Sequence, residues 1–533
     1  MESTGELKQA IKRNPRDALN RALGFFRSGE ITEALALSQK IITVEPTFVD
    51  AWLLLCQLQL NIQRSDRALQ CADKALALKP DNLQAQMLRA ESLLADSQSV
   101  EATRALKSLE DKSQHQALNQ RLIGNMYAGL QSYDSASCCF QRALKLAPDD
   151  IDCWHLYSGV LFAQGLLIEA EKALSEVLRL NPQHAEALLT RANMRRQTRQ
   201  DNHLQQLETA LGAGQASPQD RVMLGYALAK ELEDVEDYPE AFNRLQCAAD
   251  ENDGLLDYTV ERDVGFMKDL CTIYTQKISD RRVEPMLGEG IIFVVSLPRA
   301  GSTLVDRIIA SHSAVASRGE TGAFHDALLQ HARAASARKK MTFVDALAEI
   351  DYPALGKSYL EKLGREPTES TWLVDKTPAN IQYLGLIHKA LPRAKIIHVH
   401  KLPMDACYSF YKTYFSGGYG YSYNLQKLGQ YYVAYYRMMN YWRQMLPGVF
   451  LDMSYEQLVE DQTAQTRRLL EYCGLEWQQQ CMEFHNNSSP TATASVVQVR
   501  QPMFRSSLGK WRCYEQQLAP LTSVLRQAGI ETA

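Results

Sequence analysis

A short polar segment, Arg299 to Thr303 (RAGST), carries side chains suited to binding an anion. It follows five apolar residues, Ile291 to Val295, whose continuous run predicts a strand buried on both faces. The apolar periodicity from Leu304 to Ile309 predicts a helix directly after the turn. The first N–H groups of a helix lack partners within the helix and lie at the positive end of its dipole. A strand, a tight turn and a helix in this order therefore predict an anion site.

A nucleoside-triphosphate P-loop is the first alternative for such a segment. It requires the pattern GxxxxGK[ST], whereas this turn contains Arg299 and no lysine. The residues after the third expected strand, His400, Lys401 and Leu402, include no acid that could hold magnesium. The sequence therefore disfavours a metal-dependent NTPase, and we expect no metal.

The rest of the second half alternates strands and helices. Besides 291–295, strands are expected at residues 371–375, 395–400 and 449–453. Helices are expected at residues 323–335, 343–363, 378–391, 404–415, 425–445 and 455–473. This alternation predicts an α/β domain with a parallel sheet, helices on both faces, and ligands at the carboxyl ends of the strands.

The first half repeats every 34 residues. Proline occupies one register of this lattice, with one vacancy, at Pro46, Pro80, Pro148 and Pro182. Alanine occupies another without a gap, at Ala34, Ala68, Ala102, Ala136 and Ala170. Small residues let two helices cross closely, and proline ends the second helix of each unit. The pattern resembles the tetratricopeptide repeat over roughly residues 14 to 200, with a degenerate unit around Ala229 and Ala241.

Stacked repeats of this kind form an α-solenoid whose groove often binds peptides or proteins. We therefore expect a peptide or protein partner there. The alternative is an array that only orients or dimerises the second domain, which leaves a homo-oligomer open. The expected domains are a solenoid over residues 1–250, a helical linker over 251–287 and the α/β domain over 288–533.

Composition narrows the class of protein. A length of 533 residues predicts two or more domains, and a net charge of −4 argues against nonspecific nucleic-acid binding. Apolar runs fall short of the roughly 20 residues that span a membrane, and the first 16 residues do not form a signal peptide. Eleven cysteines without CxxC spacing indicate reduced thiols and a cytoplasmic protein.

The segment FVVSLPRAGSTLVDRIIASHSAVASRGE resembles the part of sulfotransferases that binds PAPS, 3′-phosphoadenosine 5′-phosphosulfate. Its PR form is similar to the bacterial tetratricopeptide-repeat sulfotransferases and the tyrosylprotein sulfotransferases. The resemblance continues through VDKTPANIQYLGLIHKALPRAKIIHVHKLPMDACYS, SYEQLV and TASVVQVRQPMFRSSLGKWRCYE, and covers residues 288–520. It implies a P-loop-like domain that transfers a sulfuryl group from PAPS to a hydroxyl, leaving adenosine 3′,5′-bisphosphate.

The resemblance also implies roles for single residues. Five turn residues match those that hold the 5′-phosphosulfate: Arg299, Ala300, Gly301, Ser302 and Thr303. Glu320, 21 positions after Arg299, matches the general base. Lys376 matches the lysine that steadies the leaving phosphate, and Ser495 matches a serine that reaches the same oxygens.

The far end of the nucleotide departs from the family pattern. Lys401 and Ser409 match the residues that hold the 3′-phosphate, Tyr455 the aromatic beside adenine, and Lys510 a second lysine near the phosphates. Where the family has Arg-Arg-Asp-Pro, this chain has His400 to Pro403 (HKLP), and lysine lacks the bidentate fork of arginine. Either the 3′-phosphate is held more weakly or His400 assists.

The sequence leaves two functions open. The first is a PAPS-dependent sulfotransferase whose acceptor is a peptide tyrosine, a glycan or a small molecule. The second is a repeat-based binding scaffold whose nucleotide-binding domain has lost turnover. The many tyrosines between Tyr408 and Tyr441 suit an acceptor pocket, although their helical spacing favours core packing.

Overall fold

The computed structural model describes residues 4–214, 216–364, 371–487, 489–490, 496–503 and 508–532. Contacts divide the chain into two compact units, Met1–Val160 and Leu161–Ala533. This division falls inside the repeat array, so the last repeat helices belong to the same unit as the sheet. The domain borders expected at residues 250 and 287 stay predictions.

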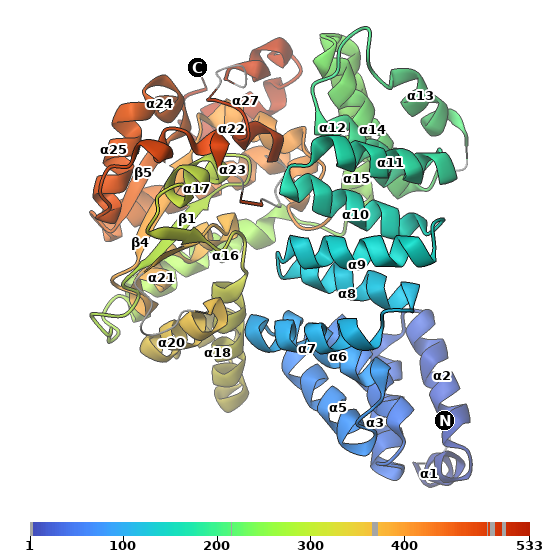
Figure 1. Ribbon diagram of the computed structural model, residues 1–533. Coiled ribbons are helices and arrows are strands. Elements are labelled where there is room, and N and C mark those ends of the chain that lie inside the picture. Colours follow the sequence, from blue (N-terminus) through green and yellow to red (C-terminus); the bar gives the residue numbers. More distant parts are fainter. Residues whose placement is uncertain are drawn as a thin grey trace. The chain divides into compact units, whose positions relative to one another are not determined.

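The first unit consists of antiparallel helix pairs, drawn blue to cyan in Figure 1. Its helices are α1 (Thr4–Arg13), α2 (Pro15–Arg27), α3 (Ile31–Val44), α4 (Val49–Asn61), α5 (Ser65–Leu78), α6 (Leu83–Ala95), α7 (Ser99–Lys112), α8 (Ala117–Gly129), α9 (Tyr133–Leu146) and the start of α10 (Ile151–Gln164). Pro46 and Pro80 stand two residues after the ends of α3 and α5, as predicted.

The alanine register lies where the helices pack. Ala34, Ala68, Ala102 and Ala136 have no exposed surface. At Gly124 on α8, a Cβ atom would lie 3.0 Å from the Phe140 ring of α9, so this crossing also needs a small residue. These contacts confirm the repeat architecture that the 34-residue lattice predicts.

Further helices of the expected solenoid lie in the second unit. They are α11 (Leu167–Leu180), α12 (Ala185–Met194), α13 (Leu204–Gly212), α14 (Pro218–Asp234) and α15 (Tyr238–Leu255). Next comes α16 (Val260–Ile273), whose π-helical extension ends at Ile278. Tyr274 in that extension packs edge-on against Trp442, with ring centroids 5.0 Å apart. The segment expected to be a linker thus contributes to the core of the α/β domain.

Five parallel strands form the predicted sheet, in the order β2-β3-β1-β4-β5. They are β1 (Ile291–Ser296), β2 (Val315–Ser317), β3 (Trp372–Asp375), β4 (Lys395–His400) and β5 (Phe450–Ser454). All six residues of the central strand β1 are buried, as its apolar run predicts. Strand β2 was not expected, because three residues are too few to give a strand pattern.

Side chains of β1 alternate between two cores. Phe293 belongs to the core built with α16, α18 (Ala323–Lys339), α20 (Tyr352–Leu363), α21 (Leu384–Ala390) and α23 (Leu425–Met445). Val294 belongs to the opposite core, built with α17 (Ser302–Ala310), α24 (Tyr455–Glu460) and α25 (Gln462–Cys473). Helices therefore cover both faces of the sheet.

Several predicted helices are shorter or broken. Residues 343–363 form α19 (Phe343–Leu347) and α20, because Asp351 caps a new helix whose second residue is Pro353. Residues 455–473 form α24 and α25, and Asp461 caps the second by accepting a hydrogen bond from the N–H of Ala464 at 2.9 Å. Residues 404–415 form only α22 (Pro403–Tyr411), and 378–391 begin as a 3-10 helix.

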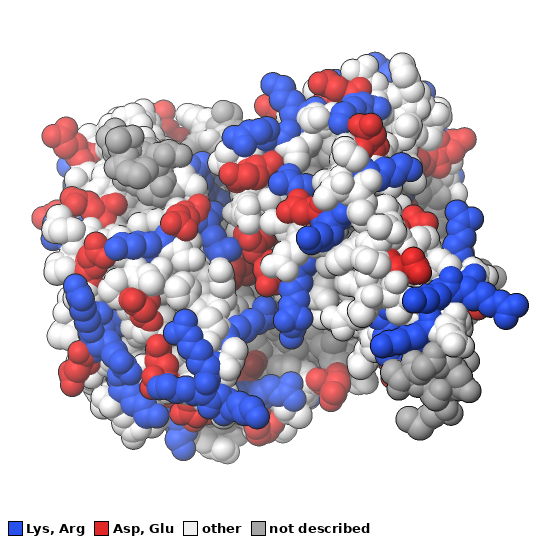
Figure 2. Space-filling model, turned by 90° about the horizontal axis from the view of Figure 1, so that it is seen from below, with Lys and Arg blue, Asp and Glu red and all other residues white. Residues whose placement is uncertain are grey.

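The described surface mixes both signs of charge. Figure 2 shows Lys and Arg side chains interspersed with Asp and Glu on the face turned to the viewer. Within the described ranges, none of the helices has both the length and the apolar composition needed to cross a membrane.

Gly356 tests the packing of α20 on α21. A Cβ atom at Gly356 would collide with the backbone oxygen of Ala390 and with Leu287, whereas one at Gly265 in α16 would meet nothing within 4 Å. We expect Gly356→Ala to lower the free energy of unfolding by about 1–3 kcal/mol. The matched Gly265→Ala is expected to raise it by about 0.5–1 kcal/mol. Urea denaturation measures both, and equal effects would contradict this packing.

Candidate active site

The turn between β1 and α17 has an unusual backbone. Arg299 has a φ of 64° and Gly301 a φ of 103°, both in the left-handed region. A Cβ atom at Gly301 would lie 2.5 Å from Cδ2 of Tyr455, so glycine is required both by the backbone and by the ring. Helix α17 begins at Ser302, immediately after the turn (Figure 1). The strand, turn and helix that predict an anion site are all present.

Two cations lie beside this turn. Burial lowers the pKa of Arg299. Burial, followed by the charge of Arg299, lowers the pKa of Lys401 to about 8. The Lys401 ammonium lies 4.3 Å from the centre of the Tyr455 ring, which itself contacts Gly301. A partly buried cation beside a buried one is costly in the free protein, and this cost falls when an anion binds between or beside them.

The hydroxyl residues of the turn are also buried. Ser302 is 4% exposed and Thr303 is 6% exposed, both in the first turn of α17. Ala300 is buried beside them, so a larger side chain at this position would have to displace the core. The turn therefore has little room for substitution on its inner side.

Glu320 and Lys376 meet at the carboxyl ends of β2 and β3. Lys376 Nζ lies 2.5 Å from Glu320 Oε1; the lysine side chain is 2% exposed and the glutamate 49%. The backbone holds the pair, since the N–H of Lys376 donates to the carbonyl of Gly319 at 2.9 Å. The N–H of Thr321 likewise donates to the Thr377 hydroxyl at 3.1 Å. A buried ammonium thus meets a carboxylate that solvent can reach.

Further acids lie around this pair. Asp375 is fully buried and accepts hydrogen bonds from Tyr359, Thr377 and Thr321 at 2.6–3.2 Å. Burial raises the pKa of Asp306 on α17 above its ordinary value, although the charge of Lys376 opposes this shift. The charge of Lys376 therefore acts on an acid of α17 as well as on Glu320. Asp306 was not among the residues expected at the site, although a charged residue inside the apolar run LVDRII was a usable signal.

The residues expected at the far end of the nucleotide are more dispersed. Ser409 is half-buried on α22. Lys510 begins the 3-10 helix η6 (Lys510–Tyr514), and its ammonium donates to the Tyr238 hydroxyl at 3.3 Å. The N–H of Gly509 donates to Asp405 at 2.9 Å, which joins η6 to the start of α22. Ser495 lies outside the described residues.

His400 does not supply the positive charge of the missing arginine at neutral pH. Burial, and then the charge of His398, lower its pKa to about 4. A neutral imidazole adds no positive charge at pH 7, so Lys401 supplies the charge at this position. The tyrosines between Tyr421 and Tyr435 lie mainly in the core, where the rings of Tyr421 and Tyr431 stack with centroids 3.5 Å apart.

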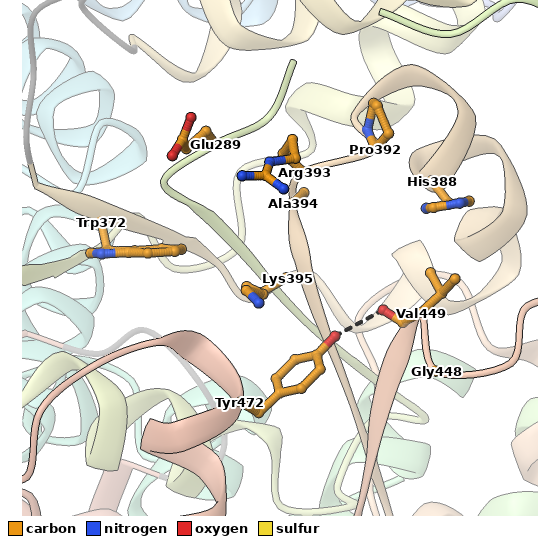
Figure 3. A pocket seen from close by; sticks show the side chains of 10 residues that line it. All are labelled: Glu289, Trp372, His388, Pro392, Arg393, Ala394, Lys395, Gly448, Val449 and Tyr472. Carbon is orange, nitrogen blue, oxygen red and sulfur yellow. Dashed lines mark hydrogen bonds between the residues drawn. The ribbon is translucent and has the colours of Figure 1, made fainter. Parts of the chain in front are cut away.

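A cavity of about 360 Å³ lies at the opposite end of the sheet, where the strands begin. Figure 3 shows its wall at the beginnings of β3, β4 and β5, with Trp372, Lys395 and Tyr472 among the lining side chains. The Tyr472 hydroxyl donates to the carbonyl of Val449 at 2.8 Å. None of the predicted site residues lines this cavity, because they follow the carboxyl ends of the strands.

Within the described residues, no cluster of His, Cys, Asp and Glu could hold a metal ion.

Comparisons with known proteins bear on both halves. Residues 291–479 match the sulfotransferase family model, and residues 25–92 and 122–150 match tetratricopeptide-repeat models. The sulfotransferase match includes Arg299, Glu320, Lys376 and Lys401, and ends before Ser495 and Lys510. The chain thus combines tetratricopeptide repeats with a sulfotransferase-family domain.

Individual proteins that resemble this chain share less than a third of their residues with it. An uncharacterized protein of Aquifex aeolicus is 28% identical over 435 residues, which cover 79% of this chain and 56% of that protein. The chain therefore spans little more than half the length of this relative. The sulfotransferase domain of the curacin biosynthetic pathway is 15% identical, with a TM-score of 0.33 over 47% of this chain and all of that domain. A thermophilic repeat protein of Thermus thermophilus is 21% identical, with a TM-score of 0.30 over 34% of this chain and 97% of that one.

The low pKa of Lys401 predicts that this cation destabilises the ligand-free fold. Between pH 8 and about 10.5 the unfolded chain holds a proton on Lys401 that the folded chain has lost, so wild-type stability gains with pH in this window. Lys401→Met should therefore raise the free energy of unfolding at pH 7 by about 1–3 kcal/mol, and this gain should shrink by pH 10. Urea denaturation at several pH values measures the difference.

Lys395→Met is the reference variant for this experiment. Lys395 lies at the start of the same strand, 5.1 Å from the centre of the Tyr472 ring, and so controls for loss of a lysine–aromatic contact. A Lys401→Met protein that is less stable than the wild type at pH 7 would contradict the assigned cost of the buried charge.

Proposed function

Because a sulfotransferase-family domain follows tetratricopeptide repeats in this chain, we propose that the protein transfers the sulfuryl group of PAPS to an acceptor hydroxyl. The observation that carries the proposal is the contact between buried Lys376 and half-exposed Glu320 at the carboxyl edge of the sheet. Sulfuryl transfer requires a base that the acceptor can reach, here Glu320, and a cation shielded from solvent, here Lys376.

The residues around the turn suit a nucleotide with several negative charges. The first N–H groups of α17 and the hydroxyls of Ser302 and Thr303 would hold the 5′-phosphosulfate, with Arg299 beside them. Lys401 would meet the 3′-phosphate, together with Ser409 and Lys510 from neighbouring elements. Tyr455 would lie near adenine, and its ring also lies against Gly301 of the turn. The lowered pKa values of Arg299 and Lys401 support an anion here.

PAPS supplies a sulfuryl group bonded to a phosphate that leaves readily. Glu320 takes the proton of the acceptor hydroxyl as the acceptor oxygen bonds to sulfur. Lys376 stabilises the negative charge that remains on the bridging oxygen when its bond to sulfur breaks. The products are a sulfated acceptor, adenosine 3′,5′-bisphosphate and a proton on Glu320. Arg299 and the N-terminus of α17 neutralise the phosphosulfate oxygens without moving, because the turn is fixed by Gly301 and Tyr455.

The acceptor and partner are proposed at the level of class. The acceptor is a hydroxyl able to reach Glu320, with peptide tyrosine as the first class to test. The repeat groove would deliver a peptide or protein, as repeats of this kind commonly do. A cytoplasmic location stays a prediction from the cysteine pattern.

Glu320→Gln separates binding from transfer. The amide keeps the size of the side chain but cannot take a proton, so sulfate transfer should fall about a hundredfold or more while nucleotide affinity is kept. Transfer is measured from labelled PAPS into lysate fractions sorted into protein, glycan and small-molecule pools.

Glu349→Gln is the matched control, since Glu349 forms an ion pair with Lys339 at 2.7 Å away from the turn. Full transfer by Glu320→Gln would place the base elsewhere. Nucleotide binding by the wild type with no transfer into any pool would favour the inactive scaffold.

Nucleotide affinity should depend on the protonation of Lys401. Its pKa of about 8 means that it loses its charge above pH 8, so an anion binds there only with uptake of a proton. The affinity for adenosine 3′,5′-bisphosphate should therefore fall by up to about tenfold per pH unit above pH 8. Isothermal titration from pH 7 to 9.5 measures this dependence.

Lys401→Arg removes the dependence, because arginine stays charged throughout this range and also offers a bidentate fork to phosphate. Parallel pH profiles for the two proteins would exclude Lys401 from the phosphate site. The absence of binding by the wild type at millimolar nucleotide would overturn the proposed function itself.

A further inference from the structure

The C-terminal part of the chain lies against the last repeat helices. Arg500 donates to the carbonyl of Ala163 at 3.2 Å, and its guanidinium fills the space where Gly165 lacks a side chain. Lys510 contacts Tyr238 on α15, with its ammonium 4.8 Å from the ring centre. Tyr514 packs on Phe242 of the same helix, with ring centroids 5.4 Å apart. The repeats therefore support a segment that includes a predicted site residue.

A buried carboxylate on α14 completes this support. Glu233 accepts hydrogen bonds from Lys412 at 2.7 Å, from Tyr514 at 3.2 Å and from the Tyr408 hydroxyl. Its side chain is 15% exposed. Burial alone would raise the pKa of Glu233, but the charges and hydrogen bonds of Lys412, Tyr408 and Lys510 lower it below its ordinary value. Glu233 therefore remains ionised inside the protein.

The partners of Glu233 come from two elements of the predicted 3′-phosphate site. Tyr408 precedes Ser409 on α22, and Lys412 directly follows that helix. Tyr514 ends η6, the helix that Lys510 begins. The rings of Tyr408 and Tyr514 lie 5.1 Å apart, so one carboxylate fixes both elements against each other.

We propose that Glu233, a residue of the repeat helices, is a positioning residue for the 3′-phosphate end of the nucleotide site. The inference rests on the proposed function, since it concerns the binding of adenosine 3′,5′-bisphosphate. Glu233 orients Ser409 and Lys510 through their helices, by its hydrogen bonds to Tyr408, Lys412 and Tyr514. Its loss should therefore affect recognition of the 3′-phosphate and leave recognition of the 5′-phosphate intact.

The test compares two nucleotides on the full chain. Isothermal titration gives the affinities of the wild type and Glu233→Gln for adenosine 3′,5′-bisphosphate and for adenosine 5′-phosphate. We expect the variant to lose about tenfold in affinity for the first and to keep its affinity for the second, as lost hydrogen bonds to a charged group imply. Unchanged affinities, or an equal loss for both nucleotides, would overturn the inference.

Glu231→Gln is the matched control. Glu231 is a fully buried carboxylate on the same helix, and it accepts from the N–H of His203 at 2.6 Å within the repeats. This variant should leave the ratio of the two affinities unchanged, even if it lowers stability.

Tyr514→Phe serves as a second, milder variant if Glu233→Gln does not fold. It removes one donor to Glu233 and keeps the ring, so the affinity ratio should shift by about threefold in the same direction. An unshifted ratio in this variant would also count against the inference. A wild type that binds neither nucleotide refutes the proposed function, whereas a wild type that binds both, with variants of unchanged ratio, refutes only the role of Glu233.

Discussion

The contact between Lys376 and Glu320 depends on the order of the sheet. Strands β2 and β3 are neighbours and run parallel, so the chain leaves both at the same edge. The turn after β2 then presents Glu320 to the lysine that follows β3. A buried ammonium needs a negative partner, and here that partner is held at 2.5 Å by two turns that also bond to each other. In an antiparallel pair, the residues that follow the two strands would lie at opposite ends of the sheet.

The site concentrates charge that the fold alone does not need. Lys401 is buried and Arg299 partly buried, and desolvation lowers the pKa of both. Such an arrangement opposes stability in the ligand-free protein and is typical of sites that bind an anion. The repeats take part in this balance, because Glu233 on α14 meets Lys412 at the end of α22. Helix α14 thus packs as a structural part of the unit that contains the sheet.

Local patterns predicted most of the architecture. The apolar run before Arg299 and the 34-residue lattice each depend on neighbours in sequence, and both appear in the structure. Two predicted helices are broken at Asp351 and Asp461, which cap the helices that follow. These aspartates were local signals of a helix start, but the prediction followed the apolar periodicity that continues across them.

Long-range contacts could not be predicted in the same way. Glu233 meets residues 175 to 281 positions away, and no spacing in the sequence indicates that contact. The pairing of Glu320 with Lys376 was expected only as a shared role, since the order of the strands, which creates it, cannot be read from one sequence. Asp306 was overlooked because its helix was judged by its apolar residues alone.

A crystal structure with adenosine 3′,5′-bisphosphate tests the central claim most directly. The proposed sulfuryl-transfer site requires the 5′-phosphate at the N-terminus of α17, beside Arg299, with Lys376 and Glu320 facing it and the 3′-phosphate toward Lys401. A nucleotide bound instead in the cavity at the beginnings of the strands, beside Trp372 and Tyr472, would contradict the proposed site.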